Sequence, residues 1–162
     1  MTEIPELHIL PATKDDARAV MKWFDDAEGV MFWGSPYMRY PLREETYFTD
    51  LHWGHIESRV ARDDDGQLVA FGQFYEKLGR CHLARLVVNP ALRRRGIARK
   101  FIDALMRHGG AALDTREFSL YVMTANKPAW NCYKSLGFRM RPYPTNDPHL
   151  DNCVFMVAER PD

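Results

Sequence analysis

The chain has 162 residues, which is close to the usual size of one domain and disfavours a two-domain enzyme. Hydrophobic residues make up 46% and charged residues 27%, and nine Phe, seven Tyr and four Trp are too many for a disordered chain. Lys and Arg together number 22, as do Asp and Glu, so no net charge draws the chain to nucleic acid or to an anionic membrane.

Cysteine use and the absence of a targeting signal point to the cytoplasm. Cys81, Cys132 and Cys153 are odd in number, widely spaced and without a CxxC pair, so they indicate neither a disulfide framework nor a zinc knuckle. The opening residues carry acids where a secretory signal needs basic residues, and no run of 18 apolar residues could cross a bilayer. We expect a cytoplasmic protein with no membrane partner and no nucleic-acid partner.

The first third of the chain predicts one strand, two helices and an aromatic loop. Residues 7–10 form a short apolar strand, and Thr13 is the N-cap of an amphipathic helix that Gly29 ends. Residues 30–40 mix aromatic side chains with glycine and proline and predict a loop. A second short helix is expected over residues 43–51.

Three strands of an antiparallel meander are expected next, over residues 56–60, 68–75 and 81–88. The pattern then changes to a helical period from Ile97, and Gly109-Gly110 closes that helix.

A last strand–helix–strand–strand series completes the chain. It comprises a strand over 118–124, a short helix over 128–136 and final strands over 138–140 and 153–158. This order predicts an α/β (α+β) protein with a mixed sheet and helices on its faces, in one domain spanning residues 1–162.

A basic loop between the strand at residues 86–88 and the helix at Ile97 is the most informative segment. Unpaired backbone N–H groups at a helix start attract phosphate. Gly96 permits close backbone approach, Ala98 leaves the first turn uncrowded, and the three arginines from Arg93 add cationic donors. A solvated basic helix start is the alternative. The loop lacks the glycine motifs of ATP and NAD sites.

Two motifs resemble those of the GCN5-related N-acetyltransferase (GNAT) family. Arg93-x-x-Gly96-x-Ala98 resembles the family's acyl-CoA pyrophosphate loop, Q/R-x-x-G-x-G/A. Asn126–Phe138 resembles its later motif, N-x-x-A-x-x-x-Y-x-x-x-G-F, with a helix and a strand between the two. The resemblance implies a GNAT-like acyl-CoA N-acyltransferase fold, which is a mostly antiparallel sheet with two splayed parallel central strands and helices on both faces.

The resemblance also implies acetyl-CoA as co-substrate. No metal is expected, because His52 and His55 have no nearby third ligand at zinc spacing. The residues implied to bind acetyl-CoA are Leu86, Val87, Val88, Arg93, Arg94, Arg95, Gly96, Ile97, Ala98, Arg99, Asn126 and Tyr133. By resemblance, the backbone of residues 86–88 pairs with pantetheine and the loop over 94–99 holds the pyrophosphate.

The implied reaction is direct transfer of acetyl from the thioester to a primary amine in a ternary complex. A backbone N–H near Val88 would stabilise the carbonyl oxygen. Tyr133 would hydrogen-bond to or protonate the departing sulfur, because a phenol of reference pKa about 10 keeps its proton at neutral pH. A core tyrosine is the other interpretation of Tyr133. No acyl-enzyme is expected, since no Cys or Ser in the motifs sits beside a base.

The general base is the least defined part of the implied mechanism. Many family members use a glutamate on one of the two splayed strands, and this chain has none at either place. His82 occupies the position on the first strand and is the predicted catalytic base, since imidazole is suited to deprotonation near neutral pH. A buried, hydrogen-bonded histidine is the alternative. Glu57, Glu76 or an amine that needs no base are further options.

The acceptor is expected to bind around Phe32, Trp33, Tyr37 and Tyr121, whose rings could stack on a planar acceptor or a cation. The same aromatic loop could simply cover the core. The acceptor would be a small-molecule amine or a protein N-terminal amine, and a homodimer is compatible with the sequence. A catalytically silent acyl-CoA-binding or sensing module is the alternative function. Only the enzyme predicts CoA release that depends on an amine.

Overall fold

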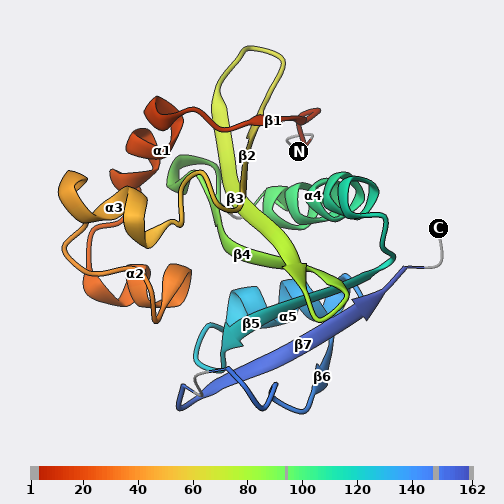
Figure 1. Cartoon of the computed structure of the whole chain (residues 1–162). Helices are drawn as coiled ribbons and strands as arrows, with labels where there is room; N and C mark the ends of the chain where they lie inside the picture. The colour runs from red at the N-terminus through yellow and green to blue at the C-terminus, as the bar shows by residue number, and fades with distance from the viewer. Residues whose placement is uncertain (1–3, 94, 148–149, 161–162) are drawn as a thin grey trace.

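The computed structural model describes residues 4–93, 95–147 and 150–160, which form strands and helices in a mixed order (Figure 1). The strands are β1 (His8–Pro11), β2 (Glu57–Arg62), β3 (Leu68–Lys77), β4 (Arg80–Val88), β5 (Glu117–Met123), β6 (Arg139–Arg141) and β7 (Cys153–Glu159). The helices are α1 (Lys14–Met21), α2 (Ala27–Gly34), α3 (Glu44–Asp50), α4 (Ile97–Leu113) and α5 (Lys127–Ser135), and a 3₁₀ turn, η1 (Pro90–Leu92), precedes α4.

The strands form one seven-stranded sheet in the order β1-β2-β3-β4-β5-β7-β6. Neighbouring strands are antiparallel except β4 and β5, which are parallel. The parallel pairing is confined to Cys81 with Phe118 and His82 with Ser119, after which the two strands diverge. The predicted mixed sheet with two splayed parallel central strands is therefore confirmed.

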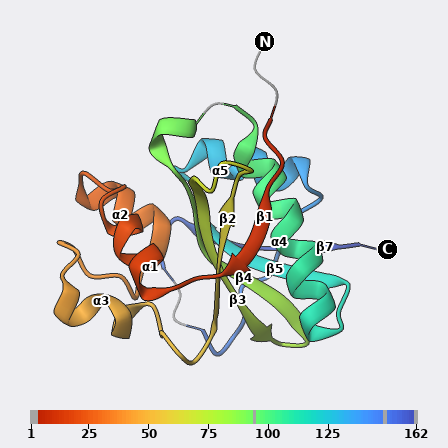
Figure 2. The ribbon, with the colours of Figure 1, turned by 90° about the horizontal axis from the view of Figure 1, so that it is seen from above.

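Helices cover both faces of the sheet (Figures 1 and 2). The helices α1, α2 and α3 pack on one face, against a buried cluster that includes Val60 and Phe71. The helices α4 and α5 pack on the other, against a cluster that includes Ala61 and Ala70. Side chains alternate across a strand, so adjacent residues of β2 and β3 serve opposite clusters. Burial of these apolar side chains is the main source of stability.

The segment predicted as an aromatic loop over residues 30–40 begins as a helix. Helix α1 ends at Met21, and α2 starts at Ala27 with Gly29 inside it. Asp26 caps α2, because its side chain accepts a hydrogen bond from the N–H of Gly29 at 2.8 Å. The prediction was wrong because Gly29 was interpreted as a helix stop, whereas the aspartate before it is a start signal.

Helix α4 also runs through the two glycines that were expected to end it. It stops where Asp114 takes a left-handed conformation with φ of 52°. A Cβ atom at Gly109 would lie 2.8 Å from Sγ of Cys81, and one at Gly110 would lie 2.8 Å from the carbonyl oxygen of Thr115. These glycines therefore allow close packing of α4 on the sheet.

The meander of β2, β3 and β4 agrees with the prediction, β6 is shifted by one residue from the expected 138–140, and β7 ends one residue later than expected. In the part of the chain that the structure describes, no helix combines the length and apolar character needed to cross a membrane.

Candidate functional site

The gap between β4 and β5 follows an irregularity in β4. This strand pairs with β3 through Val87 with Phe71 and Ala84 with Gln73, so it holds one extra residue over that interval. The extra residue makes a β-bulge, and Arg85 takes a φ of 49°, which is uncommon for a side chain other than glycine. A bulged strand bends. Within the described residues, the edge of β4 that faces β5 has no strand partner beyond His82.

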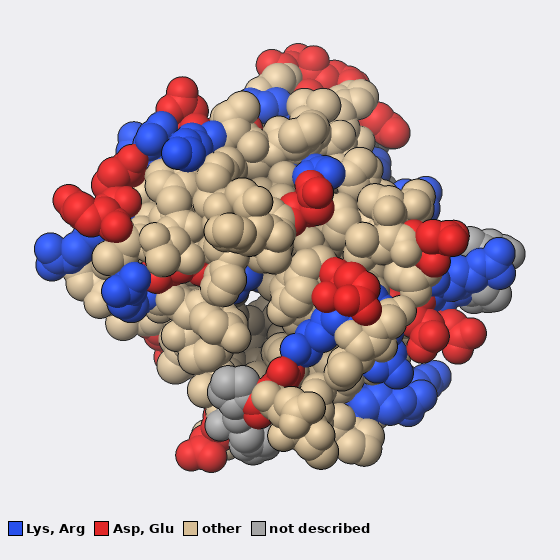
Figure 3. Space-filling view, in the orientation of Figure 1, with Lys and Arg blue, Asp and Glu red and all other residues tan. Residues whose placement is uncertain are grey.

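Successive residues of β4 line two pockets, residues 86–88 the one and residues 82–85 the other. The first, here called the loop pocket, measures about 730 Å³ and lies between residues 86–88, the basic loop, the first turn of α4, and α5. The second, the aromatic pocket, measures about 100 Å³ and lies between α2, the loop after it, and strands β3, β4 and β5. Figure 3 shows a hollow between the surface over α2 and the surface over β4 and β5. The loop pocket is the larger of the two.

The start of α4 gives the loop pocket an anion-binding end. Gly96 is the N-cap residue with a φ of 74°, and no described side chain caps the helix. The N–H groups of the first turn and the helix dipole favour negative charge at this point. Arg93 lines the same pocket and adds a cation to it. A phosphate group would therefore be stabilised here.

Most residues predicted to bind the co-substrate are brought together. The loop pocket is lined by the predicted residues Leu86, Val87, Val88, Arg93, Gly96, Ile97, Ala98, Arg99 and Tyr133. Arg99 donates a hydrogen bond to Oγ of Ser135 at 3.1 Å, which ties α4 to α5. Arg95 is exposed in the loop and is absent from the pocket lining, and Arg94 lies outside the described residues.

Helix α5 places Cys132 and Tyr133 at the loop pocket. Asn126 caps this helix by accepting a hydrogen bond from the N–H of Ala129 at 3.5 Å, and it lines an adjoining hollow instead. The side chain of Tyr133 is buried, and burial raises its pKa. Its hydroxyl has no hydrogen-bond partner in the described chain, where no fully buried polar atom lacks one. The hydroxyl therefore reaches the space of the pocket.

A small polar network lies in the aromatic pocket. The hydroxyl of Tyr121 donates a hydrogen bond to the carboxylate of Asp147. Lys77 forms an ion pair with the same carboxylate, with Nζ and Oδ2 2.8 Å apart. Among the described residues that line this pocket, Asp147 supplies the only carboxylate.

His82 lies buried at the edge of the aromatic pocket, with an exposed fraction of 2%. Its Nδ1 is 2.8 Å from Oγ of Ser119. Burial, and then the positive charges of Lys77 and Arg85, lower the pKa of His82 to about 3. The imidazole is therefore neutral at pH 7 and is a weak proton acceptor. This environment matches the alternative of a buried, hydrogen-bonded histidine.

All four predicted acceptor-site residues line the aromatic pocket, in different ways. Trp33 is buried, and its Nε1 donates a hydrogen bond to the carbonyl oxygen of Arg85 at 2.8 Å, so it fixes the bulge. Tyr37 is 47% exposed, and its ring centroid lies 5.9 Å from the guanidinium of Arg85. Phe32 and Tyr121 are half-buried.

The two glutamates considered as alternative bases do not line either pocket. Glu57 forms an ion pair with Arg59 at 2.7 Å. Glu76 accepts a hydrogen bond from the N–H of Gly79 at 2.7 Å in the turn after β3. Both side chains are occupied and exposed, so neither is placed to act in the gap between β4 and β5.

Sequence reasoning missed three charged residues of the aromatic pocket, which are Lys77, Arg85 and Asp147. The available signal was strongest for Arg85, because it interrupts an otherwise apolar run over residues 83–88 in a central strand. A charge is rarely buried without a reason.

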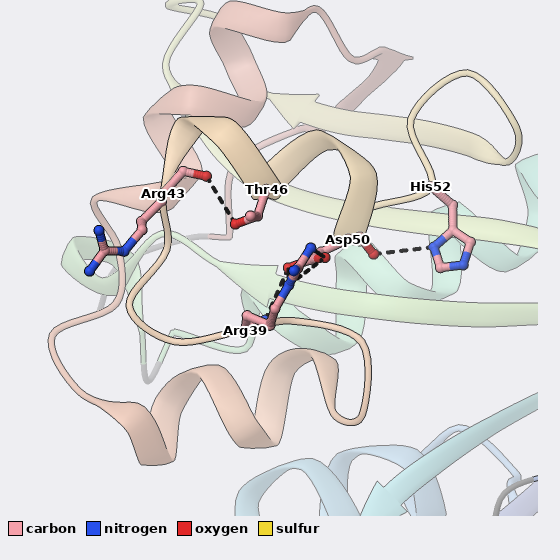
Figure 4. A network of polar contacts seen from close by, with 5 residues as sticks. All are labelled: Arg39, Arg43, Thr46, Asp50 and His52. Carbon is pink, nitrogen blue, oxygen red and sulfur yellow. Dashed lines mark hydrogen bonds and ion pairs between the residues drawn. The ribbon is translucent and has the colours of Figure 1, made fainter.

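An ion pair braces the loop that borders the aromatic pocket (Figure 4). Arg39 donates hydrogen bonds to Asp50 from Nη2 at 2.6 Å and from its backbone N–H at 3.1 Å. Burial raises the pKa of Asp50, but the hydrogen bonds and charge of Arg39 outweigh it, so the pKa is lowered. Nδ1 of His52 lies 3.2 Å from the carbonyl oxygen of Asp50, and the hydroxyl of Thr46 donates to the carbonyl oxygen of Arg43 at 3.4 Å.

Asp50→Asn is expected to lower the free energy of unfolding by about 2 kcal/mol at pH 7, because it weakens hydrogen bonds to a charged group. The lowered pKa of Asp50 stabilises the fold above the unfolded-state value of about 3.9, and this stabilisation is lost as the pH falls through the lower folded-state pKa. Thermal unfolding from pH 7 to pH 3 should show the difference between parent and variant shrinking in acid. A difference that stays constant over this range would contradict the assignment.

A family model described as the acetyltransferase (GNAT) family matches residues 18–138. The chain belongs to the acetyltransferase (GNAT) family. The matched residues include both sequence motifs and both strands of the gap. The predicted family and the enzyme class, an N-acetyltransferase, are confirmed.

Two kinds of relative accompany this GNAT match. A [ribosomal protein bS18]-alanine N-acetyltransferase from Salmonella typhimurium is 29% identical over 126 residues, which cover 73% of this chain and 81% of the relative. The crystal structure of spermidine N-acetyltransferase from Vibrio cholerae in complex with CoA and spermine has a TM-score of 0.70 at 17% identity, covering 94% of this chain and 95% of that one. At this identity the structural likeness shows the fold.

A second structure, of spermidine/spermine N-acetyltransferase from Vibrio cholerae with manganese ions, has a TM-score of 0.66 at 17% identity and covers 94% of this GNAT chain and 92% of that one. Within the described ranges of this chain, no group of three or more His, Cys, Asp or Glu side chains is arranged to hold a metal ion.

Proposed function

We propose that this GNAT protein transfers an acetyl group from acetyl-CoA to a primary amine of a small molecule or a protein N-terminus. The observation that carries this is that successive residues of β4, at its open edge, line the aromatic pocket and then the loop pocket. Ligands in the two pockets would present their reacting ends to each other at this point. Direct attack in a ternary complex is therefore favoured.

The loop pocket fits acetyl-CoA, which would supply the acetyl group as a thioester. The uncapped start of α4 and Arg93 suit its phosphates. The unpaired edge of β4 at residues 86–88 offers N–H and C=O groups that suit the amides of pantetheine. We assign the stabilisation of the thioester carbonyl oxygen to a backbone N–H near Val88.

Tyr133 is the proposed hydrogen-bond donor to the departing sulfur. Burial raises its pKa, so the phenol stays protonated and full proton transfer to a thiolate is disfavoured. A charge-assisted hydrogen bond from Tyr133 to the sulfur stabilises the negative charge as the C–S bond breaks. Cys132 lines the same pocket, but burial raises the pKa of its thiol and leaves little thiolate. Labelled acetyl found on Cys132 would contradict direct attack.

The proton of the attacking amine needs an acceptor that the amine can reach, and His82 is 2% exposed with its Nδ1 2.8 Å from Oγ of Ser119. We propose Asp147 instead, with Tyr121 as a bridge: the amine proton passes to Oη of Tyr121 while the Tyr121 proton passes to the carboxylate. Asp147→Asn should lower kcat at least about tenfold, and His82→Gln should lower it less. Lys77→Met is the control for loss of the ion pair. If His82→Gln has the larger effect, the base role returns to His82.

A thermal-shift comparison with acetyl-CoA, CoA, ATP and NAD tests the co-substrate site. A ligand that binds only the folded state at 100 times its Kd adds about 2.7 kcal/mol, or roughly 5–10 °C in Tm for a chain of this size. We expect a rise confined to the two CoA compounds, followed by amine-dependent release of free thiol. No rise with either compound would contradict the proposal. Binding without amine-dependent release would favour the silent acyl-CoA-binding module.

We place this reaction in the cytoplasm. The three cysteines are free thiols, which suits a reducing compartment. The formal charges balance, so no net positive charge attracts the chain to nucleic acid or to an anionic membrane, and we propose neither as a partner.

A further inference from the structure

Arg85 is a buried arginine at the bulge of β4, and none of the described carboxylates pairs with it. Only 8% of this residue is exposed. The groups that favour its charged form are two tyrosines, Tyr75 and Tyr37, with no aspartate or glutamate among them. A buried cation without a counter-ion is costly to the fold. Such a cost is typical of functional sites.

Specific hydrogen bonds hold Arg85 in this buried position. Its Nε donates a hydrogen bond to Oε1 of Gln73. Gln73 is itself fully buried, and its Nε2 donates to the carbonyl oxygen of Leu51 at 2.8 Å and to Oγ of Ser58 at 2.9 Å. Nε1 of Trp33 holds the carbonyl oxygen of Arg85 at 2.8 Å. The amide of Gln73 is therefore oriented from one side and fixes the guanidinium on the other.

The two terminal nitrogens of Arg85 reach the aromatic pocket. They make no hydrogen bond within the described ranges, and no fully buried polar atom there lacks a partner, so they contact the open space that Arg85 lines. The ring of Tyr37 lies 5.9 Å from the guanidinium carbon. A guanidinium presents parallel N–H donors that match the two oxygens of a carboxylate.

The other charges of the aromatic pocket cancel. Lys77 and Asp147 form an ion pair at 2.8 Å. Asp147 is the sole acid among the described lining residues, so Arg85 leaves the pocket with a net positive charge. A polyamine would be repelled by this charge, whereas an acceptor with an anionic group would supply the missing counter-ion.

We propose that Arg85 determines acceptor specificity and that the acceptor is a small primary amine that also carries a carboxylate or a similar oxyanion. The substrate class rests on the acetyltransferase function proposed above. The two terminal nitrogens of Arg85 bind the anionic group, which holds the acceptor in the aromatic pocket with its amine free to face the open edge of β4.

The test compares amines in matched pairs by acetyl-CoA-dependent release of thiol. The panel holds the common L-amino acids, β-alanine and γ-aminobutyrate, each beside its amide, together with spermidine and a short peptide amide. The protein should acetylate at least one carboxylate-bearing amine with kcat/KM about 100-fold above that of its amide. Arg85→Met should lower kcat/KM for that acid about 100-fold and change the value for the amide little. Arg85→Lys should recover part of the lost kcat/KM, since lysine keeps the positive charge but lacks the parallel N–H donors of the guanidinium.

Two controls separate misfolding from loss of specificity. Arg85→Met replaces an unpaired buried cation by an apolar side chain, so its Tm should stay or rise and the shift with acetyl-CoA should be retained. Arg59→Met removes an arginine on β2 whose side chain is only 15% exposed and which lies outside both pockets, and it should leave the preference unchanged.

Spermidine, the peptide amide or the amino acid amides reacting as well as the acids would overturn the assignment. So would a retained preference for acids in Arg85→Met, or binding of acetyl-CoA with no reaction of any carboxylate-bearing amine. Absence of a thermal shift with acetyl-CoA would overturn the acetyltransferase function itself, which distinguishes the two failures.

Discussion

Gly96→Glu is expected to weaken acetyl-CoA binding at least about 100-fold, which is about 2.7 kcal/mol. The glutamate would put bulk and negative charge at the N-cap of α4, where the N–H groups of the first turn are open to a phosphate. The φ of 74° disfavours any side chain at this residue, and a Cβ atom would lie 3.1 Å from Cδ1 of Ile4. Calorimetric titration with acetyl-CoA measures the loss.

Gly66→Glu is the matched control for strain and charge. Gly66 has a φ of 80° in the turn between β2 and β3, and a Cβ atom there would meet nothing within 4 Å. This variant should carry a similar backbone cost and keep its affinity for acetyl-CoA. If Gly96→Glu melts near the temperature of Gly66→Glu yet binds acetyl-CoA as the parent does, the phosphates are held elsewhere.

The fold and the gathering of residues at the loop pocket could be predicted because their signals are local. The switch from alternating to helical periodicity after residue 88 predicts the strand–loop–helix unit. The glycine at the start of the helix takes a left-handed conformation that other residues rarely adopt. The same local reasoning failed at Gly29, because a glycine next to a capping aspartate suits either a helix stop or a helix start.

The charged residues of the aromatic pocket could not be predicted, because their placement depends on contacts between distant parts of the chain. The carboxylate of Asp147 meets Lys77 across 70 residues of sequence. A bulge in β4 directs Arg85 to the aromatic pocket, and no residue type in β4 predicts that bulge. The low pKa of His82 follows from its burial between strands, and this burial cannot be predicted from a histidine in an alternating strand pattern. Burial and strand register determine the surroundings of these residues, and both are properties of the folded sheet.

Tyr133→Phe is expected to lower kcat about 100-fold and to leave the affinity for acetyl-CoA nearly unchanged, as when one donor to a developing negative charge is removed. The hydroxyl of Tyr133 has no partner in the described chain, so its loss breaks no structural hydrogen bond. Tyr47→Phe is the matched control. This buried hydroxyl donates to the carbonyl oxygen of Ala17 at 2.7 Å outside both pockets, so its loss should lower Tm and spare kcat.

The pH dependence sharpens this test. Because the pKa of Tyr133 is raised above its reference of about 10, the parent rate should not fall between about pH 8 and pH 10 through loss of its proton. Single-turnover thiol release over this range, with the parent and both variants, separates a donor to the sulfur from a packing residue. A Tyr133→Phe variant as active as the parent at every pH would remove Tyr133 from the mechanism and leave the departing sulfur to the backbone and solvent of the loop pocket.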